Sequence, residues 1–152
     1  MAKNKRSLTK PSRQIRQLKF LIGNWHTKGE ILQGVPNASK EISGMDTYEW
    51  ISGGFFILHR VDVFMGDIKT EVIEIIGYDE DRKCFFMKSF DNHGEATTLY
   101  AVLEKNGVLK LGDKKMRSTL TVNKSGNSMT AKWELSENGK TWTPWMDMKF
   151  IK

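Results

Sequence analysis

The fold is decided by residues 18–29, which read LKFLIGNWHTKG. Leu18, Leu21 and Ile22 complete an amphipathic helical turn, and after Gly23 the pattern changes to the alternation of a β-strand. A glycine permits the sharp exit from a helix that a side chain resists. Trp25 then brings the largest apolar surface to the first strand. The stretch therefore predicts a short helix that closes one end of a small β-barrel, followed by the first strand of that barrel.

A helix start signal precedes this stretch. Pro11 is followed by Ser12, whose hydroxyl is a candidate N-cap. With the helix starting there, its apolar face is expected to comprise Ile15, Leu18 and Ile22, spaced i, i+3 and i+7. The helix is thus expected to be short and to pack on the barrel through this single face.

From Asn24 onward the chain alternates between strand-like runs and turn signals, at the spacing of an all-β barrel. The predicted strands are 24–33, 40–51, 55–65, 68–78, 84–90, 96–104, 108–112, 116–123, 128–135 and 142–151. No long helical period recurs among them. We predict one all-β domain, a single antiparallel up-and-down barrel of 8–10 strands with the short N-terminal helix closing one end.

One hairpin turn, Gly66-Asp67, sets a register that brings two polar side chains together. It pairs Met65 with Ile68, Val63 with Thr70, Val61 with Val72, His59 with Glu74 and Ile57 with Ile76. The opposite face carries Arg60, Lys69 and the like-charged neighbours Asp62 and Glu71, which are tolerable only in water. His59 and Glu74 are therefore expected to point together into an otherwise apolar interior.

Two further turns predict registers. The loop Asn92-His93-Gly94, with Gly94 in the left-handed region, pairs Ser89 with Thr97, Met87 with Leu99 and Phe85 with Ala101, which leaves Phe86 and Phe90 outside. Asn138-Gly139, treated as a two-residue turn, pairs Leu135 with Trp142, Trp133 with Pro144, Ala131 with Met146 and Met129 with Met148. All eight of the latter residues are expected on the inner face.

The basic residues are unevenly distributed along a chain of net charge +6. Seven of the 24 lie before residue 20, where there is no acidic residue, and the remaining 17 are balanced by 18 acidic residues. A nucleic-acid surface needs cations spread over a folded face, so no nucleic-acid partner is expected. Residues 1–11 are instead predicted to form a basic flexible arm, with the barrel domain at 12–152.

Cysteine usage and hydropathy indicate the compartment. Cys84 is the single cysteine, which excludes an intrachain disulfide and fits a reducing cytoplasm. The longest apolar run among the first forty residues is Phe20-Leu21-Ile22, too short for a signal peptide or a membrane span. We expect a soluble cytoplasmic protein with no membrane partner.

Several motifs carry a resemblance to known barrels. Gly23-Asn24-Trp25 behind a short helix resembles the Gly-x-Trp signature of lipocalins and other calycins, and residues 25–29 are similar to the opening of nitrobindin-like domains. In order and spacing, the segments 49–56, 76–79 and 89–91 resemble a bacterial lipocalin-like family of unknown function. The resemblance, which extends to fatty-acid-binding-protein-like barrels, implies a cavity for a small, mostly apolar molecule. The family has no settled activity to carry over.

The resemblance also bears on cofactors. Nitrobindin-like barrels bind haem through a histidine late in the chain, whereas no histidine follows His93 here. A haem would have to be ligated by His59 from another wall, and we expect no cofactor. His26, His59 and His93 lie on different strands or turns and give no support to a metal site.

Three functional hypotheses follow. The first is a non-catalytic protein that binds a small hydrophobic or amphiphilic molecule inside the barrel, with His59 and Glu74 as polar anchor and Ile76, Met87, Leu99, Trp133, Met148 and Trp25 as further ligand-binding residues. In it, Glu74 orients the imidazole and the free ring nitrogen bonds the ligand; the alternative is a purely structural pair. The second hypothesis is a calycin-type enzyme with the same pair as acid and base. The third is a solid barrel acting as an interaction module, a monomer or a homodimer formed through Phe86 and Phe90.

Overall fold

The computed structural model describes residues 10–34 and 36–152. Residues 1–9 of the predicted arm lie outside the described residues. The chain starts with a short helix, α1 (Arg13–Arg16), continued by a 3₁₀ segment, η1 (Gln17–Leu21). Ser12 caps α1, because its hydroxyl accepts the N–H of Ile15 at 3.2 Å. Among the described residues, no helix is long and apolar enough to cross a membrane.

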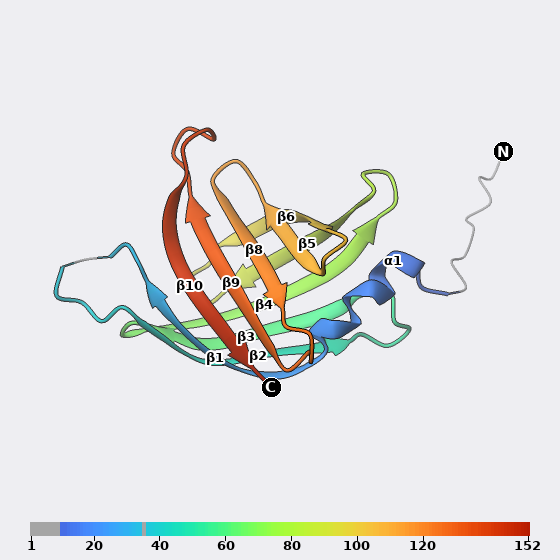
Figure 1. The fold of residues 1–152 in the computed structure, drawn as a ribbon, viewed down its shortest axis with the longest axis horizontal. Coiled ribbons are helices and arrows are strands. Elements are labelled where there is room, and N and C mark those ends of the chain that lie inside the picture. The colour runs from blue at the N-terminus through green and yellow to red at the C-terminus, as the bar shows by residue number, and fades with distance from the viewer. Residues whose placement is uncertain (1–9, 35) are drawn as a thin grey trace.

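Ten strands follow the helix. Their bounds are β1 (Gly23–Ile31), β2 (Glu41–Trp50), β3 (Ile57–Met65), β4 (Ile68–Asp79), β5 (Cys84–Asp91), β6 (Ala96–Leu103), β7 (Val108–Gly112), β8 (Met116–Val122), β9 (Ser128–Leu135) and β10 (Thr143–Ile151). Each pairs antiparallel with its sequence neighbours, and β1 also pairs with β10, so the sheet closes on itself (Figure 1). The predicted all-β, up-and-down barrel is confirmed.

Two of the predicted hairpin registers are confirmed pair by pair. Across β3 and β4, His59 lies opposite Glu74 and Asp62 opposite Glu71. Across β5 and β6, Met87 lies opposite Leu99, and Gly94 adopts a φ of 90° as its loop position requires. These tight turns leave no freedom to shift the strands, so the inner face follows from them.

The register predicted from Asn138-Gly139 is wrong. Asn138 does not adopt a positive φ; its side chain instead accepts the N–H groups of Lys140 and Thr141, each at 2.8 Å, which widens the loop. A register shift between Pro144 and Met146 then places Met146 opposite Trp133 and Met148 opposite Ala131. Of the eight residues expected inside, Pro144 is exposed, and Trp142 lies under the guanidinium of the exposed Arg117.

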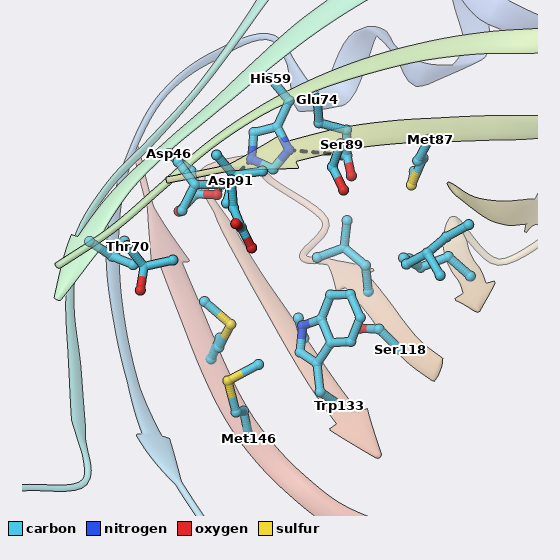
Figure 2. Close-up of a pocket in the computed structure, with 18 of the residues that line it drawn as sticks. Asp46, His59, Thr70, Glu74, Met87, Ser89, Asp91, Ser118, Trp133 and Met146 are labelled. Carbon is cyan, nitrogen blue, oxygen red and sulfur yellow. Dashed lines mark hydrogen bonds and ion pairs between the residues drawn. The ribbon is translucent and has the colours of Figure 1, made fainter. Parts of the chain in front are cut away.

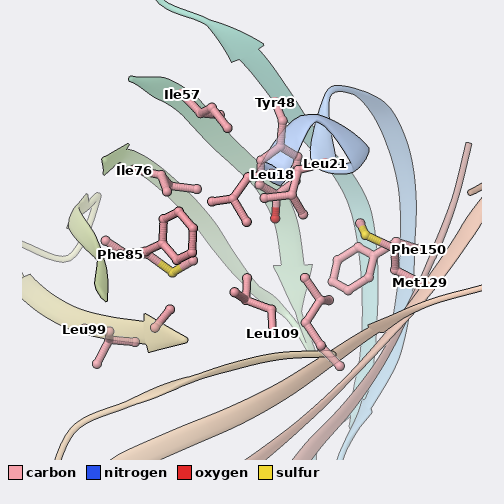
Figure 3. Close-up of a cluster of buried hydrophobic side chains, with 14 of the residues drawn as sticks. Leu18, Leu21, Tyr48, Ile57, Ile76, Phe85, Leu99, Leu109, Met129 and Phe150 are labelled. Carbon is pink, nitrogen blue, oxygen red and sulfur yellow. The ribbon is translucent and has the colours of Figure 1, made fainter. Parts of the chain in front are cut away.

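The helix contributes a buried face that differs from the predicted one by a single residue. Ile15, Leu18 and Leu21 are at most 1 % exposed, whereas Ile22, expected on this face, is half-buried in an extended conformation. The 3₁₀ segment brings side chains into line every third residue, which explains the change from Ile22 to Leu21. Leu18 and Leu21 pack among strand residues that include Ile57, Ile76 and Phe85 (Figure 3).

The barrel therefore has a closed end. We define it by the buried residues of the main core cluster that do not line the cavity described below: Ile15, Leu18, Trp25, Ile57, Phe85, Ala101 and Met129. On the outside, Phe90 is 60 % exposed, and Phe86 lies over Gly77 beside Phe56, with the two rings 6.3 Å apart. Both aromatic residues lie outside, as the register predicts.

Candidate functional site

The interior beyond the closed end holds a cavity of about 560 Å³. Most of its wall is aliphatic, aromatic or thioether, and all ten strands contribute to it (Figure 2). Leu21 lies at its base. Ile68, at the start of β4, and His93, in the β5–β6 turn, also line the cavity and are exposed at the opposite end of the barrel. The cavity thus starts beneath the helix and reaches solvent near the β3–β4 and β5–β6 turns.

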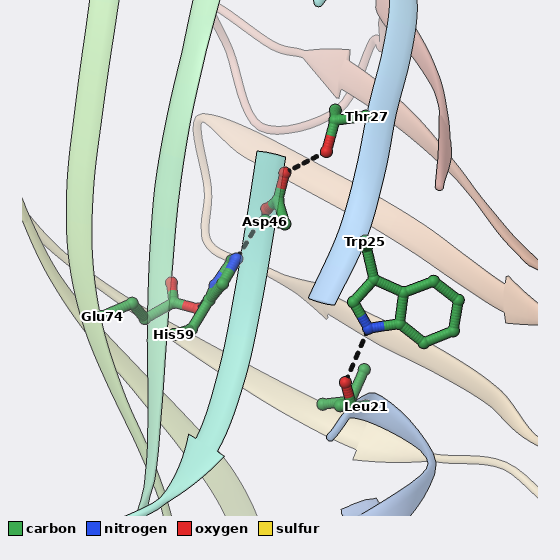
Figure 4. Close-up of polar contacts among 6 residues, drawn as sticks. All are labelled: Leu21, Trp25, Thr27, Asp46, His59 and Glu74. Atoms are coloured by element: carbon green, nitrogen blue, oxygen red, sulfur yellow. Dashed lines mark hydrogen bonds and ion pairs between the residues drawn. The ribbon is translucent and has the colours of Figure 1, made fainter. Parts of the chain in front are cut away.

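A chain of four polar side chains crosses one wall of this cavity. The Thr27 hydroxyl donates to Oδ1 of Asp46 at 2.5 Å, and Oδ2 of Asp46 lies 2.7 Å from Nε2 of His59. Nδ1 of the same imidazole lies 2.9 Å from Oε1 of Glu74 (Figure 4). Thr27 and Asp46 are 1 % and 3 % exposed, and the side chains of His59 and Glu74 are 11 % and 15 % exposed. The chain is therefore a largely buried network with its Glu74 end nearest solvent.

Strand register explains why these residues meet. Tyr48 of β2 lies opposite His59 of β3, which lies opposite Glu74 of β4. Asp46 precedes Tyr48 by two residues and so shares its face. Thr27 follows Trp25 by two residues on the neighbouring strand, which brings its hydroxyl to Asp46. Three adjacent strand pairs thus assemble the network without any loop.

His59 must carry a proton on each ring nitrogen. Ionised carboxylates only accept hydrogen bonds, so an imidazole held between two of them donates from both sides. Burial by itself lowers the pKa of His59, but the hydrogen bonds and charges of Asp46 and Glu74 outweigh it and raise this pKa to about 9. The Tyr48 ring stacks on the imidazole at 3.9 Å and 7°, a contact that favours the cation.

The same network affects Tyr48. Its pKa is raised well above the usual value of 10, first by burial and then by the charges of Asp46 and Glu74. The phenol is therefore neutral throughout the physiological range. The boundary between closed end and cavity thus carries two carboxylates, one imidazolium and one neutral phenol.

This geometry corrects the role expected for His59. A free ring nitrogen was expected to bond the ligand, but Asp46 occupies it. Asp46 and Thr27 were missed because the connection between β2 and β3 is a six-residue loop, Ile51–Phe56, rather than a tight turn that sets a register. A usable signal existed: alternation along β2 places Asp46 on the same face as Ile42 and Tyr48.

The structure brings most of the predicted ligand-binding residues together on the cavity wall: His59, Glu74, Ile76, Met87, Leu99, Trp133 and Met148. Trp25 is placed elsewhere, fully buried in the closed end. Its indole N–H donates to the carbonyl of Leu21 at 2.8 Å, and the Lys152 ammonium lies 4.9 Å from its ring centroid. Trp25 therefore joins the helix to the barrel and does not line the cavity.

Several polar groups on the wall stand apart from the network, among them Asp91 and Ser118. Asp91 lies near the mouth, and its pKa is lowered mainly by the backbone N–H of Glu95, with His93 and Gly94 adding to the effect against the cost of burial. Across the cavity the buried hydroxyl of Ser118 has no hydrogen-bond partner among the described residues (Figure 2). The wall thus holds polar groups that a bound molecule could contact.

The described residues contain no cluster of three or more histidine, cysteine or acidic side chains able to hold a metal ion. A haem iron would need a free imidazole nitrogen, and both nitrogens of His59 are engaged by carboxylates. The residues around His59 therefore do not fit axial ligation of haem.

Fold and site together define a closed, ten-stranded antiparallel barrel with an internal, mostly apolar cavity crossed by a buried carboxylate–imidazole network. The chain belongs to the family described as "Protein of unknown function (DUF1579)", which it matches over residues 10–152. No protein with a curated description matches it.

Among solved structures, the chain is similar to the one titled "Crystal Structure of Rv2717c from M. tuberculosis". The TM-score is 0.65 at 11 % sequence identity, and the match covers 93 % of this chain and 98 % of the other. A likeness at this level of identity shows a shared fold and nothing about shared ligands.

Proposed function

We propose that this protein is a non-catalytic, calycin-like binding protein that holds a small hydrophobic or amphiphilic molecule inside the barrel. The observation that carries the proposal is the cavity of about 560 Å³, lined mainly by apolar side chains. Its volume falls within the range of roughly 300–1,000 Å³ typical of small-molecule sites, which combine apolar walls with a few placed polar groups. His59, Glu74 and the predicted wall residues supply that combination.

The geometry does not favour the alternative of an enzyme with His59 as general base. A general base must offer a free lone pair to the proton that it removes. Both nitrogens of His59 are hydrogen-bonded to carboxylates, and a pKa raised to about 9 keeps the ring protonated at neutral pH. A solid barrel acting only as an interaction module is equally hard to reconcile with the cavity.

Partners and location remain predictions. A ligand held in the interior needs no nucleic acid, membrane or second protein, so a monomer suffices. The half-buried free thiol of Cys84 fits a reducing cytoplasm.

Titration with a neutral apolar fluorophore, 1-N-phenylnaphthylamine, tests the proposal. We expect saturable fluorescence enhancement with the purified protein, and we expect native mass spectrometry to detect any molecule that copurifies. Ala131→Phe should weaken the saturable signal strongly, because Ala131 lines the cavity and a phenyl ring there takes up part of the space that the fluorophore would occupy. Thr130→Phe is the matched control, since Thr130 is exposed on the outer face of the same strand. Equal binding by Ala131→Phe and the wild type would place the fluorophore outside the barrel and refute the proposal.

A further inference from the structure

The charged side chains on the cavity wall are unbalanced in sign. Asp46, Glu74 and Asp91 line the cavity together with His59 and His93, and no lysine or arginine does so in the part of the chain that the structure describes. With His59 protonated, the wall still carries an excess of negative charge. This contrasts with the net charge of +6 of the whole chain.

The charged groups that remain available to a ligand are hydrogen-bond acceptors, whereas wall hydroxyls such as that of Ser118 can donate or accept. Both N–H groups of His59 and both oxygens of Asp46 are engaged within the network. Glu74 uses Oε1 for His59, whereas its Oε2 accepts no hydrogen bond from the described residues. Asp91 accepts the N–H groups of His93 and Glu95 on Oδ1, and its Oδ2 likewise accepts no hydrogen bond from the described residues. A molecule that satisfies these two carboxylates must donate hydrogen bonds.

The facing wall suits a cation as well. Trp133 and Trp145 line the cavity with their rings edge to face, the centroids 6.2 Å apart. Figure 2 places Trp133 across the cavity from His59 and Glu74. The face of an indole ring attracts a cation, and more strongly when water is excluded.

We propose that the molecule held in the cavity is an amphiphile with a protonated amine as its head group, bound by Glu74 and Asp91 with its apolar tail toward Leu21 and Leu99. This inference rests on the proposed function and adds the chemical class of the ligand. A fatty acid is the wrong class, because its carboxylate would meet like charges in a site of low dielectric. A neutral alcohol would satisfy the acceptors but leave their charge uncompensated.

Competition among three matched amphiphiles tests the proposal. Dodecylammonium, dodecanol and dodecanoate share one tail length and differ in head group, and each is titrated against bound 1-N-phenylnaphthylamine at pH 7, below its micellar concentration or, for dodecanol, below its solubility limit. We expect dodecylammonium to act at a concentration at least tenfold lower than either competitor. The net charge of +6 would favour the anion, and salt screens it at physiological ionic strength, so a preference for the cation has to come from the cavity.

Two variants of the cavity wall and one control on the outer face locate the effect. Glu74→Gln should reduce the preference for dodecylammonium over dodecanol about tenfold, and Asp91→Asn should reduce it as well. Glu71→Gln removes the same charge three residues away on the exposed outer face and should leave the preference unchanged. If Glu74→Gln fails to fold, Asp91→Asn and the wild-type order still decide the matter.

The outcomes separate this inference from the proposed function. If the fluorophore binds saturably and dodecanoate or dodecanol displaces it at the same concentration as dodecylammonium, the amine head group is refuted. The protein would still be a binding protein. A preference that survives in both Glu74→Gln and Asp91→Asn would also overturn it. If none of the amphiphiles displaces the fluorophore from the barrel, the amine is overturned and the binding protein stands. If the fluorophore does not bind inside the barrel at all, both proposals fail.

Discussion

The two ends of the barrel differ although the same ten strands build both. At the closed end, Leu18 of the helix and strand residues such as Trp25 and Ile57 are fully buried and fill the axis. Toward the other end, the strands surround a cavity of about 560 Å³. About eight strands make a barrel that its own side chains just fill, so ten leave space on the axis. The helix fills that space at one end, and the other end stays hollow.

The two ends therefore have separate roles: the closed end supplies most of the stability, and the cavity end carries the polar groups. The closed end buries large apolar side chains, which is the main source of folding free energy. The network of Asp46, His59 and Glu74 lies at the boundary, where one side of each group faces the cavity. Four predictions follow from this comparison, in order of decreasing effect.

The first compares a tryptophan from each region. Trp25→Ala should lower the free energy of unfolding by about 3–5 kcal/mol, because it removes a fully buried ring from close packing. Trp133→Ala should cost less than half of this, since Trp133 is only half-buried and already borders a cavity. Urea unfolding curves of both variants measure the difference. Equal losses would mean that both regions are packed alike.

The second concerns the boundary and its pH dependence. A pKa of about 9 in the folded state, against an ordinary value of 6.5, means that the folded protein binds the His59 proton more tightly. This stabilisation is complete below pH 6.5 and is lost as the pH rises to 9, with a magnitude on the order of 3 kcal/mol.

Denaturant titrations between pH 6.5 and 9 measure this loss. His59→Gln should flatten the profile, and His26→Gln, at an exposed histidine of β1, should leave it steep. A wild-type stability that does not change across this range would show that His59 is not held as a cation between the two carboxylates.

The third prediction inserts the same ring into each region. Ala101→Phe should cost about 1–3 kcal/mol or more, because Ala101 is 1 % exposed in the closed end and does not line the cavity. Ala131→Phe should change the free energy of unfolding by less than about 1 kcal/mol, since the cavity accommodates the ring. Thermal melts of the two variants test this, and a larger loss in Ala131→Phe would contradict the cavity.

The smallest effect is expected at Ser118. A buried hydroxyl without a partner costs free energy, so Ser118→Ala should stabilise the protein by about 1 kcal/mol. Ser136→Ala is the control: this hydroxyl is also buried, but it accepts the N–H of Gly139 at 2.8 Å, and its removal should destabilise by a similar amount. Chemical denaturation of both variants gives the comparison, and a loss of stability in Ser118→Ala would show that its hydroxyl is satisfied.

Part of the site was predictable because two tight turns set their registers locally. Gly66-Asp67 and Asn92-His93-Gly94 each allow one pairing, and from these the facing of His59 and Glu74 follows. The register predicted from Asn138-Gly139 was wrong for a local reason as well. The Asn138 side chain bonds the backbone ahead of it, and the shift before Met146 changes the register again.

By itself the sequence determined the alternation of apolar residues, the positions of the strands and the presence of an imidazole and a carboxylate on one inner face. Only the tertiary structure decided that Thr27 and Asp46 complete the network, that Trp25 belongs to the closed end and that the interior beyond it is hollow. The physical reason is the separation along the chain over which each interaction acts. Turns and alternation act over a few residues, whereas closing the barrel through β1 and β10 joins residues 23–31 to residues 143–151. The width of the interior, and therefore the space for a ligand, depends on that closure.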